Sequence, residues 1–489
     1  MTRGDGAEDA RVPPPGCPAG AENTPVEPDP GHAGEGRDEL SETTKTEAIA
    51  YDDSTPAWGI EPVPERLRVL GLLDTGLLWG NLGVSLLVIV AGTYLVPALS
   101  LPDAFLAILV GGLIGNTMLA LAGMIGADAR VPAMVLMRAP LGRRGSYLPT
   151  ALNVAQCVGW AIFELLIIAT AAAALCDELF GFSVQWLWTI AFGGIALALA
   201  LLGPIGFVRR FVRKLAIWAV PVALAYLTWW ALDGSHFGDL WSQAGEGGLS
   251  VWQGADLVVA ITVSWIPLAA DYTRFSRGRR AGFWGTGIGY LIPTFWLFSL
   301  GAVLFFSRDL TDAAALPAAV VAGGVMAALA LFALMVTETD EAFANVYSTA
   351  VSLQNLFPRV PQRLLITLVT VTATAGALAI DMASYETFLI LLGSFFVPLF
   401  AVLLADWLLA GRGYGEDDVF AAPVLRPGLI AAWVAGFALY QWLHPSGPSW
   451  WLDVVERLDP PSWGIGATVP SFLVSFALAG VVSAAARRG

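Results

Sequence analysis

The chain has 489 residues, of which 56% are hydrophobic and only 13% are charged. This composition is typical of an integral membrane protein and excludes an ordinary soluble domain. The formal net charge of −14 does not indicate a basic partner, because much of the acidic excess lies near the amino terminus, and a nucleic-acid partner is not expected.

Residues 1–64 form an acidic tail rich in Pro, Gly, Glu and Asp, with few large apolar side chains. Such a segment cannot bury enough apolar surface to offset the entropy lost on ordering. We therefore expect residues 1–64 to be disordered, on the cytoplasmic side of the membrane.

From about Leu72 the chain alternates between long apolar runs and short polar connections. The runs have roughly the length of a helix that crosses a hydrocarbon core of about 30 Å. Helices satisfy every backbone polar group within the segment, which lipid cannot do. The sequence therefore predicts an all-α membrane protein with twelve transmembrane helices. Their expected centres are near Leu86, Gly112, Phe163, Ile195, Ala223, Val263, Ile292, Leu334, Val371, Pro398, Trp433 and Val474.

The basic residues test this count, because cytoplasmic loops hold the excess of Lys and Arg. With the amino terminus inside, Arg308 and Arg457 are the only basic residues after the tail that fall on the outer side of the membrane. A miscounted span would invert every later loop, so both termini are expected in the cytoplasm, with the chain in the plasma (inner) membrane. The expected cytoplasmic set is Arg66, Arg68, Arg130, Arg138, Arg143, Arg144, Arg209, Arg210, Arg213, Lys214, Arg274, Arg277, Arg279, Arg280, Arg359, Arg363, Arg412, Arg426, Arg487 and Arg488.

The first apolar run, LLWGNLGVSLLVIVAG, is interrupted by Gly80, Asn81 and Gly83. Small residues are also common where membrane helices cross, so close packing is an alternative explanation. The sixth run contains Pro267, which removes a helical hydrogen bond just after Ser264 and Trp265.

These two interruptions lie five spans apart. An odd number of spans reverses the orientation, so two five-helix halves would be related by an in-plane pseudo-twofold axis, each beginning with a broken helix. The sequence therefore predicts a core at 65–410, with inverted repeats at about 65–235 and 250–410, and two peripheral helices within 411–489. Broken helices leave carbonyl and amide groups free to hold an ion and a polar substrate.

The third span carries Glu164 near its middle, on one face with Gln156 and Trp160. An ionisable group at this depth indicates a functional site by default. The alternative is a polar contact between packed helices, but a carboxylate is a costly choice for packing alone.

The eighth span carries an acidic cluster, Thr337–Glu341. Such a cluster normally marks a solvated loop, and it would lie in one if the span ended near residue 336. The next basic residue is Arg359, which favours a helix from roughly residue 324 to 353 with the cluster near its centre. In the inverted-repeat scheme this span is the counterpart of the third, so the two acidic spans would face one cavity.

The chain resembles the nucleobase:cation symporters, in particular the purine and cytosine permease branch. The likeness is strongest in VPAMVLMRAPLGRRGSYLPTALNVAQCVGW (131–160) and SWIPLAADYTRFSRG (264–278), and extends to 340–356, 385–409 and 466–480. The resemblance implies the leucine-transporter-like fold, with ten helices in a 5+5 inverted repeat plus two peripheral helices. It also implies import of a nucleobase with a cation by alternating access.

In that family the heterocycle lies between aromatic side chains of helices three and six. Carried onto this sequence, the resemblance implies Trp160 and Trp265 as the stacking pair. It also implies Asn81, Gln156 and Asn345 as readers of the heterocycle edge. Stacking a base on an aromatic ring contributes roughly 1–3 kcal/mol and tolerates different bases, so amide groups would discriminate among them. Glu164 and Ser264 complete the predicted substrate site.

Sodium-coupled members of the family hold the ion between the broken first helix and helix eight. The corresponding residues here are Gly80, Gly83, Thr337, Thr339 and Asp340. The carboxylates within the eighth span depart from the family, where hydroxyl groups are expected. A carboxylate can bind Na⁺ or carry a proton itself, so either Na⁺ or H⁺ is the expected co-transported ion, and no other cofactor is expected.

Two other classes of membrane protein are excluded. An intramembrane metalloenzyme would need ligands, but His32, His236 and His444 have no metal-binding spacing. The chain has three cysteines, Cys17, Cys157 and Cys176, and their spacing indicates neither a metal site nor a disulfide framework. A channel would need a repeated filter or a ring of like charges, which the sequence lacks.

The function implied by the resemblance is therefore that of a symporter for cytosine or a purine. A related heterocycle such as hydroxymethylpyrimidine, hydantoin, allantoin or thiamine is the alternative, since these molecules differ by one or two hydrogen-bonding groups. The sequence does not indicate an oligomeric state.

Overall fold

The computed structural model describes residues 60–202, 206–357, 360–461 and 463–486. Most of the expected acidic tail, residues 1–64, therefore lies outside the described residues. Within the described ranges every regular element is helical, and strand-like pairing is limited to an isolated bridge between Leu70 and Ser276. The all-α prediction is confirmed for this part of the chain.

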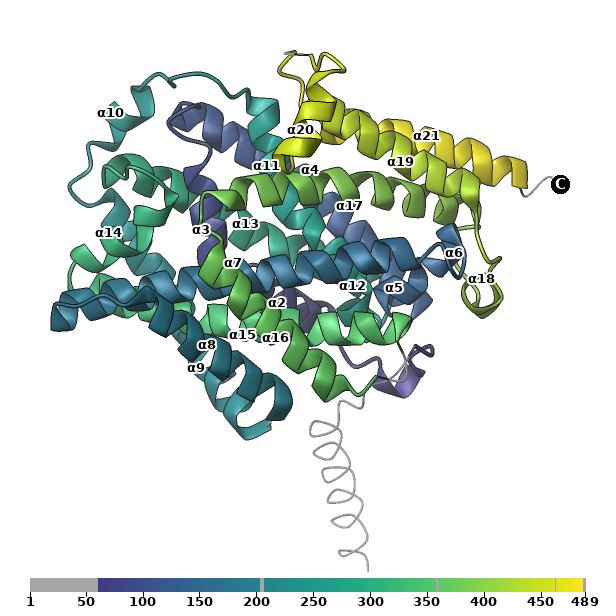
Figure 1. The fold of residues 1–489 in the computed structure, drawn as a ribbon, viewed down its shortest axis with the longest axis horizontal. Coiled ribbons are helices and arrows are strands. Elements are labelled where there is room, and N and C mark those ends of the chain that lie inside the picture. Colours follow the sequence, from purple (N-terminus) through teal and green to yellow (C-terminus); the bar gives the residue numbers. More distant parts are fainter. Residues whose placement is uncertain (1–59, 203–205, 358–359, 462, 487–489) are drawn as a thin grey trace, which may run out of the picture. The chain divides into compact units, whose positions relative to one another are not determined.

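The long helices follow the apolar runs of the sequence (Figure 1). They are α4 (Leu101–Ala129), α7 (Tyr147–Phe180), α8 (Gln185–Leu202), α9 (Gly206–Leu232), α11 (Val251–Ser264), α13 (Thr286–Ser307), α15 (Val325–Leu356), α16 (Gln362–Ala379), α17 (Ser384–Leu409), α19 (Pro427–Leu443) and α21 (Thr468–Ala486). The shorter elements are η1 (Glu65–Leu67), α2 (Leu72–Leu82), α3 (Leu86–Thr93), α5 (Ala133–Leu136), α6 (Arg138–Leu141), α10 (Phe237–Ser242), α12 (Ile266–Thr273), η2 (Ala281–Gly285), η3 (Ala313–Ala315), α14 (Leu316–Ala322), α18 (Glu416–Phe420) and α20 (Ser449–Glu456).

Among the described residues, seven helical segments are long and apolar enough to cross a membrane, and the bent pair α2 and α3 raises this number to eight. Each of the twelve expected span centres lies within a helix, that of the first span in α3. The multi-pass membrane architecture is thus confirmed, while the count of twelve spans and the inverted repeat stay predictions.

The first span is broken where its glycines predicted an interruption. The axes of α2 and α3 differ by 60°, and Gly83–Ser85 separates the two helices. Ser85 caps α3, because its hydroxyl accepts a hydrogen bond from the Leu87 N–H at 3.0 Å. A Cβ atom on Gly83 would lie 2.5 Å from Cγ of Pro293 in α13, so a glycine is needed for this close packing.

The sixth span is interrupted more weakly than expected. Trp265 alone separates α11 from α12, and the residues Val251–Thr273 run as one span. Pro267 lies in the first turn of α12, where a helix tolerates the missing N–H. The interruption is therefore a single residue rather than a bend like that of the first span.

Helix α15 extends from Val325 to Leu356, close to the expected range of 324–353. The acidic cluster Thr337–Glu341 consequently lies in the middle of a helix and not in a loop. This placement brings carboxylate side chains into the interior of the helix assembly.

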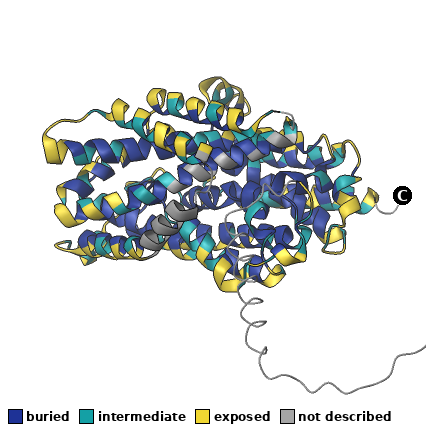
Figure 2. Cartoon of the chain, turned by 90° about the horizontal axis from the view of Figure 1, so that it is seen from below, coloured by how far each residue is buried: buried dark blue, intermediate teal, exposed yellow. Residues whose placement is uncertain are grey.

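The helices around the first-span break are packed closely. Helix α13 runs along α2 and α3, α7 packs against α15, and α4 packs against α11. A Cβ atom on Gly289 of α13 would lie 2.4 Å from the Gly76 carbonyl oxygen, and one on Gly301 would lie 1.9 Å from that of Ile89. Buried residues fill these central contacts, while the outer helices expose one side (Figure 2). Helices α19 and α21 pack on each other and on α17.

Candidate functional site

The carboxylate of Glu164 in α7 meets the amide of Asn345 in α15. Asn345 Nδ2 donates a hydrogen bond to Glu164 Oε1 at 2.7 Å. Only 1% of Glu164 and 4% of Asn345 is exposed. Glu164 Oε2 is also buried and accepts no hydrogen bond from a described residue. The structure therefore joins two of the predicted substrate-site residues across 181 positions of sequence.

Gln156, two turns before Glu164 on α7, reaches the interruption between α11 and α12. Its Nε2 donates to the main-chain carbonyl of Ser264 at 2.9 Å and to Asn153 Oδ1 at 2.8 Å. Asn153 in turn donates to the Ser352 hydroxyl at 3.0 Å. The predicted role of Ser264 thus involves its carbonyl group, because its hydroxyl donates to the carbonyl three residues earlier in α11.

Glu338 of α15 binds the break in the first span. Ser85 Oγ donates to Glu338 Oε1, and the Leu86 N–H donates to Oε2, both at 2.8 Å. A carboxylate is well placed there, because the amino-terminal end of α3 carries partial positive charge and unsatisfied N–H groups. Glu338 was not among the predicted site residues. Two features of the sequence could have identified Glu338 as a site residue. They are the carboxylate within an apolar helix and the serine that comes shortly after the predicted break.

The predicted cation-site residues lie on both sides of the same break. Gly80 and Gly83 are at the carboxyl-terminal end of α2, and their carbonyl oxygens accept no hydrogen bond from a described residue. Thr337 and Thr339 are on α15, and each hydroxyl donates to the carbonyl four residues earlier, at 3.3 and 2.9 Å. The side chain of Asp340 lies outside the described residues.

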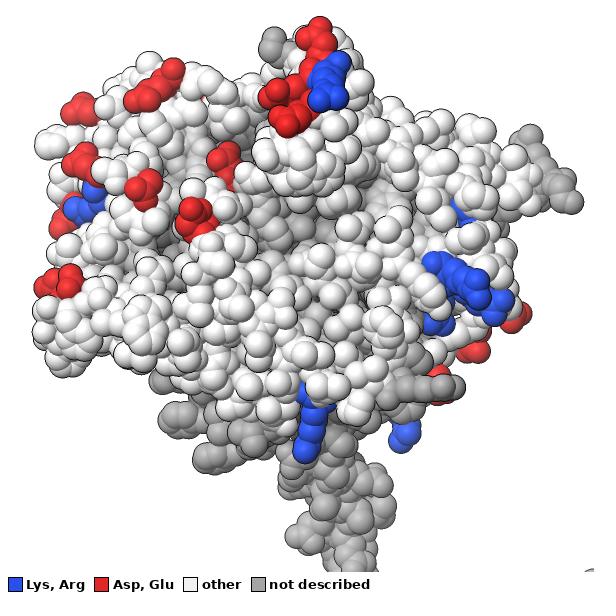
Figure 3. All heavy atoms as spheres, in the orientation of Figure 1, with Lys and Arg blue, Asp and Glu red and all other residues white. Residues whose placement is uncertain are grey.

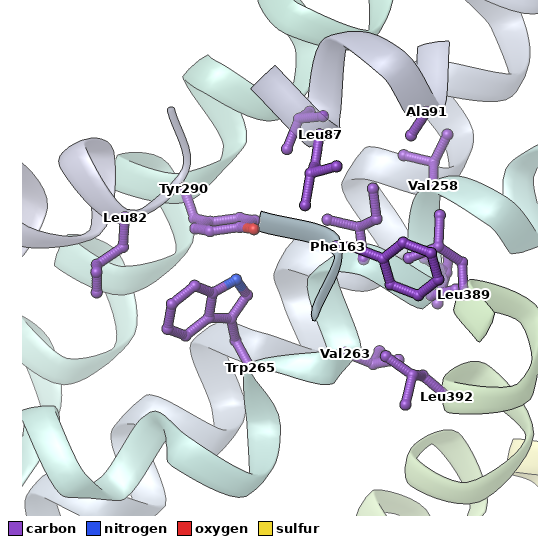
Figure 4. Packing of buried hydrophobic residues seen from close by; sticks show 14 of the residues in the cluster. Leu82, Leu87, Ala91, Phe163, Val258, Val263, Trp265, Tyr290, Leu389 and Leu392 are labelled. Carbon is purple, nitrogen blue, oxygen red and sulfur yellow. The ribbon is translucent and has the colours of Figure 1, made fainter. Parts of the chain in front are cut away.

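Trp265 belongs to a group of aromatic rings beside the break. Its indole contacts Trp79 edge-on, with ring centroids 5.8 Å apart, and Tyr290 at 6.2 Å. Figure 4 shows the indole of Trp265 next to the ring of Tyr290. Trp79 and Tyr290 come from α2 and α13, so the bent first span holds the Trp265 side chain in place.

Trp160 belongs to a second group of rings. It is half-buried, and its indole contacts Tyr385 and Phe388 of α17 edge-on, at 5.9 and 5.5 Å. Among the described residues no ring contact joins Trp160 to Trp265. The two predicted stacking partners therefore sit in separate aromatic groups. Asn81 is half-buried in the last turn of α2.

Buried carboxyl groups are concentrated in this interior region. Glu164 and Glu338 are 1% and 0% exposed and interact with each other electrostatically. The ion pairs of the described residues include neither carboxylate. Buried carboxylates are costly unless a positive charge, a proton or hydrogen bonds compensate them. The arrangement therefore suits a mobile cation together with a polar ligand.

Comparison with known proteins identifies the family. Residues 62–426 match the family described as permeases for cytosine/purines, uracil, thiamine and allantoin. The chain is 25% identical to a hydantoin permease of Microbacterium maritypicum over 371 residues, which is 71% of this chain and 74% of that one. It is 24% identical to the cytosine permease of Escherichia coli (strain K12) over 384 residues, which is 78% of this chain and 88% of that one.

The fold is similar to that of a solved transporter, Mhp1. The inward-facing conformation of Mhp1 superimposes with a TM-score of 0.72 at 20% identity, covering 88% of this chain and 95% of Mhp1. Its closed conformation with bromovinylhydantoin bound gives a TM-score of 0.68 at 19% identity, covering 89% of this chain and 96% of Mhp1. With a family match over most of the chain, this protein belongs to the cytosine/purine, uracil, thiamine and allantoin permease family, and it is a membrane transporter rather than an enzyme.

Proposed function

We propose that the protein is a secondary active symporter that imports cytosine or a purine together with a cation by alternating access. The observation that supports this most directly is the hydrogen bond between Glu164 and Asn345 in the buried interior. Polar side chains from the third and eighth spans meet there beside the broken first helix, where a transporter with inverted repeats binds its substrate.

The substrate would lie between the aromatic groups of Trp160 and Trp265, with hydrogen bonds to Asn81, Gln156 and Asn345. The Trp265 indole is held by Trp79 and the Trp160 indole by Tyr385, so each ring would offer a fixed surface to a flat ligand. Stacking on aromatic rings supplies affinity for any base, and the amides and Glu164 supply discrimination.

The cation would bind at the first-span break, between the carbonyl groups of Gly80 and Gly83 and the α15 residues Thr337, Thr339 and Asp340. Oxygen-rich positions at a helix break suit a hard cation, which makes Na⁺ the first choice and H⁺ the alternative. Uphill import needs such an ion, because a uniporter of a neutral substrate cannot accumulate it. One charge moving through about 100 mV supports accumulation of roughly fifty-fold.

The proposed architecture has twelve spans, of which ten form two inverted five-helix repeats, with both termini on the cytoplasmic side of the inner membrane. A cysteine introduced at exposed His236, between the fifth and sixth spans, should react with an impermeant thiol reagent from outside. A cysteine at exposed Asp417, after the tenth span, should not. Reversed labelling would overturn this orientation.

A second candidate function is import of a related heterocycle such as hydantoin, allantoin, hydroxymethylpyrimidine or thiamine. The observation that favours it is the match to a hydantoin permease at 25% identity, against 24% for the cytosine permease. The same aromatic groups and amides would hold any of these flat molecules.

A thermal-shift and uptake panel tests the proposal. Cytosine, uracil, adenine, hypoxanthine, hydantoin, allantoin, hydroxymethylpyrimidine and thiamine would each be added to the purified protein and to vesicles that contain it. We expect cytosine or a purine to raise the Tm and to accumulate. Glu164→Gln should change the ranking of the panel, whereas Glu178→Gln, at the exposed end of the same helix, should not. If no heterocycle bound or accumulated, the proposal would be wrong.

A further inference from the structure

A basic cavity lies away from the candidate substrate site. Its volume is about 470 Å³, and it is lined by Arg138, Arg143, Arg144, Tyr147 and Val424. These residues belong to α6, to the loop that leads into α7, to the start of α7, and to the segment that precedes α19. Since Tyr147 begins α7, the cavity and Glu164 are separated by about 25 Å along that helix. The cavity is therefore a separate feature of the molecule.

The walls of this cavity are held together by main-chain hydrogen bonds. The N–H groups of Arg143 and Arg144 each donate at 2.9 Å to a carbonyl of the segment that precedes α19. Gly142 has a φ of +89°, and a Cβ atom there would lie 2.8 Å from Cα of Leu425, so this close approach requires glycine. The arginine side chains thus extend from a fixed backbone and not from a loose loop.

A neighbouring arginine shows how the chain neutralises such a charge when its role is structural. Arg426 forms two hydrogen bonds of 2.9 Å with Asp406, whose side chain is 1% exposed. Arg143 and Arg144, by contrast, are exposed and take part in none of the ion pairs among the described residues. The carboxylates of α18, which packs against α6, form no described ion pair with them either.

Figure 3 shows basic atoms gathered on the face where Figure 1 shows α6 and α18. Burial lowers the pKa of Arg138 from its ordinary value, Tyr147 partly offsets this, and the charge of Arg143 lowers it further. An anion in the cavity would stabilise the charged form of all three guanidinium groups at once. Guanidinium groups bind phosphate oxygens in pairs, which makes phosphate a suitable anion.

Apolar side chains border the arginines. Tyr147, Leu148, Val424 and Leu425 are between 45% and 52% exposed. A soluble phosphate would gain nothing from this apolar border, whereas the acyl chains of a lipid would cover it. Basic pockets between membrane helices on the cytoplasmic side bind anionic headgroups. We propose that this cavity binds the phosphate headgroup of an anionic phospholipid, with the acyl chains lying over the exposed Tyr147, Leu148, Val424 and Leu425.

Binding of defined lipids to the full-length protein in neutral detergent tests this proposal. Phosphatidylglycerol should bind selectively, seen by native mass spectrometry and as a raised Tm, and phosphatidylcholine should not. Arg143→Gln combined with Arg144→Gln should weaken phosphatidylglycerol binding about twenty-five-fold, since each basic residue near an anionic lipid contributes a factor of roughly five.

The matched control removes the same charge from exposed arginines elsewhere, by Arg66→Gln combined with Arg280→Gln. This variant should retain the binding of the unmodified protein. Three results would overturn the proposal: an equal loss in the control, no preference for phosphatidylglycerol over phosphatidylcholine, or inorganic phosphate reproducing the whole effect. The last result would indicate a site for a soluble anion. Since this test involves no heterocycle, its outcome is independent of the proposed transport function.

Discussion

The bond between Ser85 and Glu338 should be measurable as a coupling free energy. Ser85→Ala removes a hydrogen bond to the carboxylate, which contributes about 1.5–3 kcal/mol. It also removes the cap of α3, which contributes about 1 kcal/mol. In a Glu338→Ala background the first contribution is already lost, so Ser85→Ala should cost only the second. The expected coupling free energy is therefore about 1.5–3 kcal/mol.

The measurement is a double-mutant cycle on the free energy of unfolding, followed by tryptophan fluorescence in mixed micelles. Hydrogen exchange at the start of α3 provides a local check, because the Leu86 N–H loses its acceptor in Glu338→Ala. A matched cycle pairs Glu338→Ala with Ser146→Ala, a buried serine at the start of α7 that makes no described bond to Glu338. That pair should be additive within about 0.5 kcal/mol. An additive result for Ser85 as well would refute the role of Glu338 at the break.

Three further predictions concern binding, packing and coupling. Trp160→Ala and Trp265→Ala should each weaken heterocycle binding at least about tenfold in calorimetry, with Phe replacements milder, and ordinary affinity in both Ala variants would contradict the stacking assignment. Gly83→Ala should lower the free energy of unfolding by about 1–3 kcal/mol through overpacking, whereas Gly194→Ala, where an added Cβ meets nothing within 4 Å, should not. A sodium gradient at equal pH should drive uptake into vesicles, and uptake driven by a pH gradient without sodium would show that the ion is a proton.

The sequence predicted the features that depend on local pattern. The length of the apolar run and the position of Arg359 placed the acidic cluster inside a helix, where the structure has it in α15. Gly80, Asn81 and Gly83 predicted the break of the first span, and Gly83–Ser85 separates α2 from α3 in the structure. The interruption of the sixth span was predicted to be larger than it is. A proline breaks a helix when it lies in the helix interior, whereas Pro267 lies in a first turn, where the missing N–H is tolerated.

Long-range partners could not be predicted in the same way. Ser85 and Glu338 are 253 positions apart, and the sequence around either residue does not indicate the other as its hydrogen-bond partner. The aromatic neighbours of Trp265 likewise come from α2 and α13. Any of the ten tyrosines or the eighteen other tryptophans of the chain could have packed against Trp265. Helix packing alone decides which of them do.

The acidic interior also bears on the coupling mechanism. Glu338 holds the positive end of α3 with both carboxylate oxygens, while Glu164 has one oxygen bound to Asn345 and one without a described partner. Hydrogen bonds therefore compensate Glu338 more completely than Glu164. In the proposed symport, a neutral substrate that entered alone would leave an ionised Glu164 uncompensated, whereas a cation that entered with the substrate would neutralise it. The cost of an uncompensated charge in the membrane interior thus supports the proposed joint entry of heterocycle and cation.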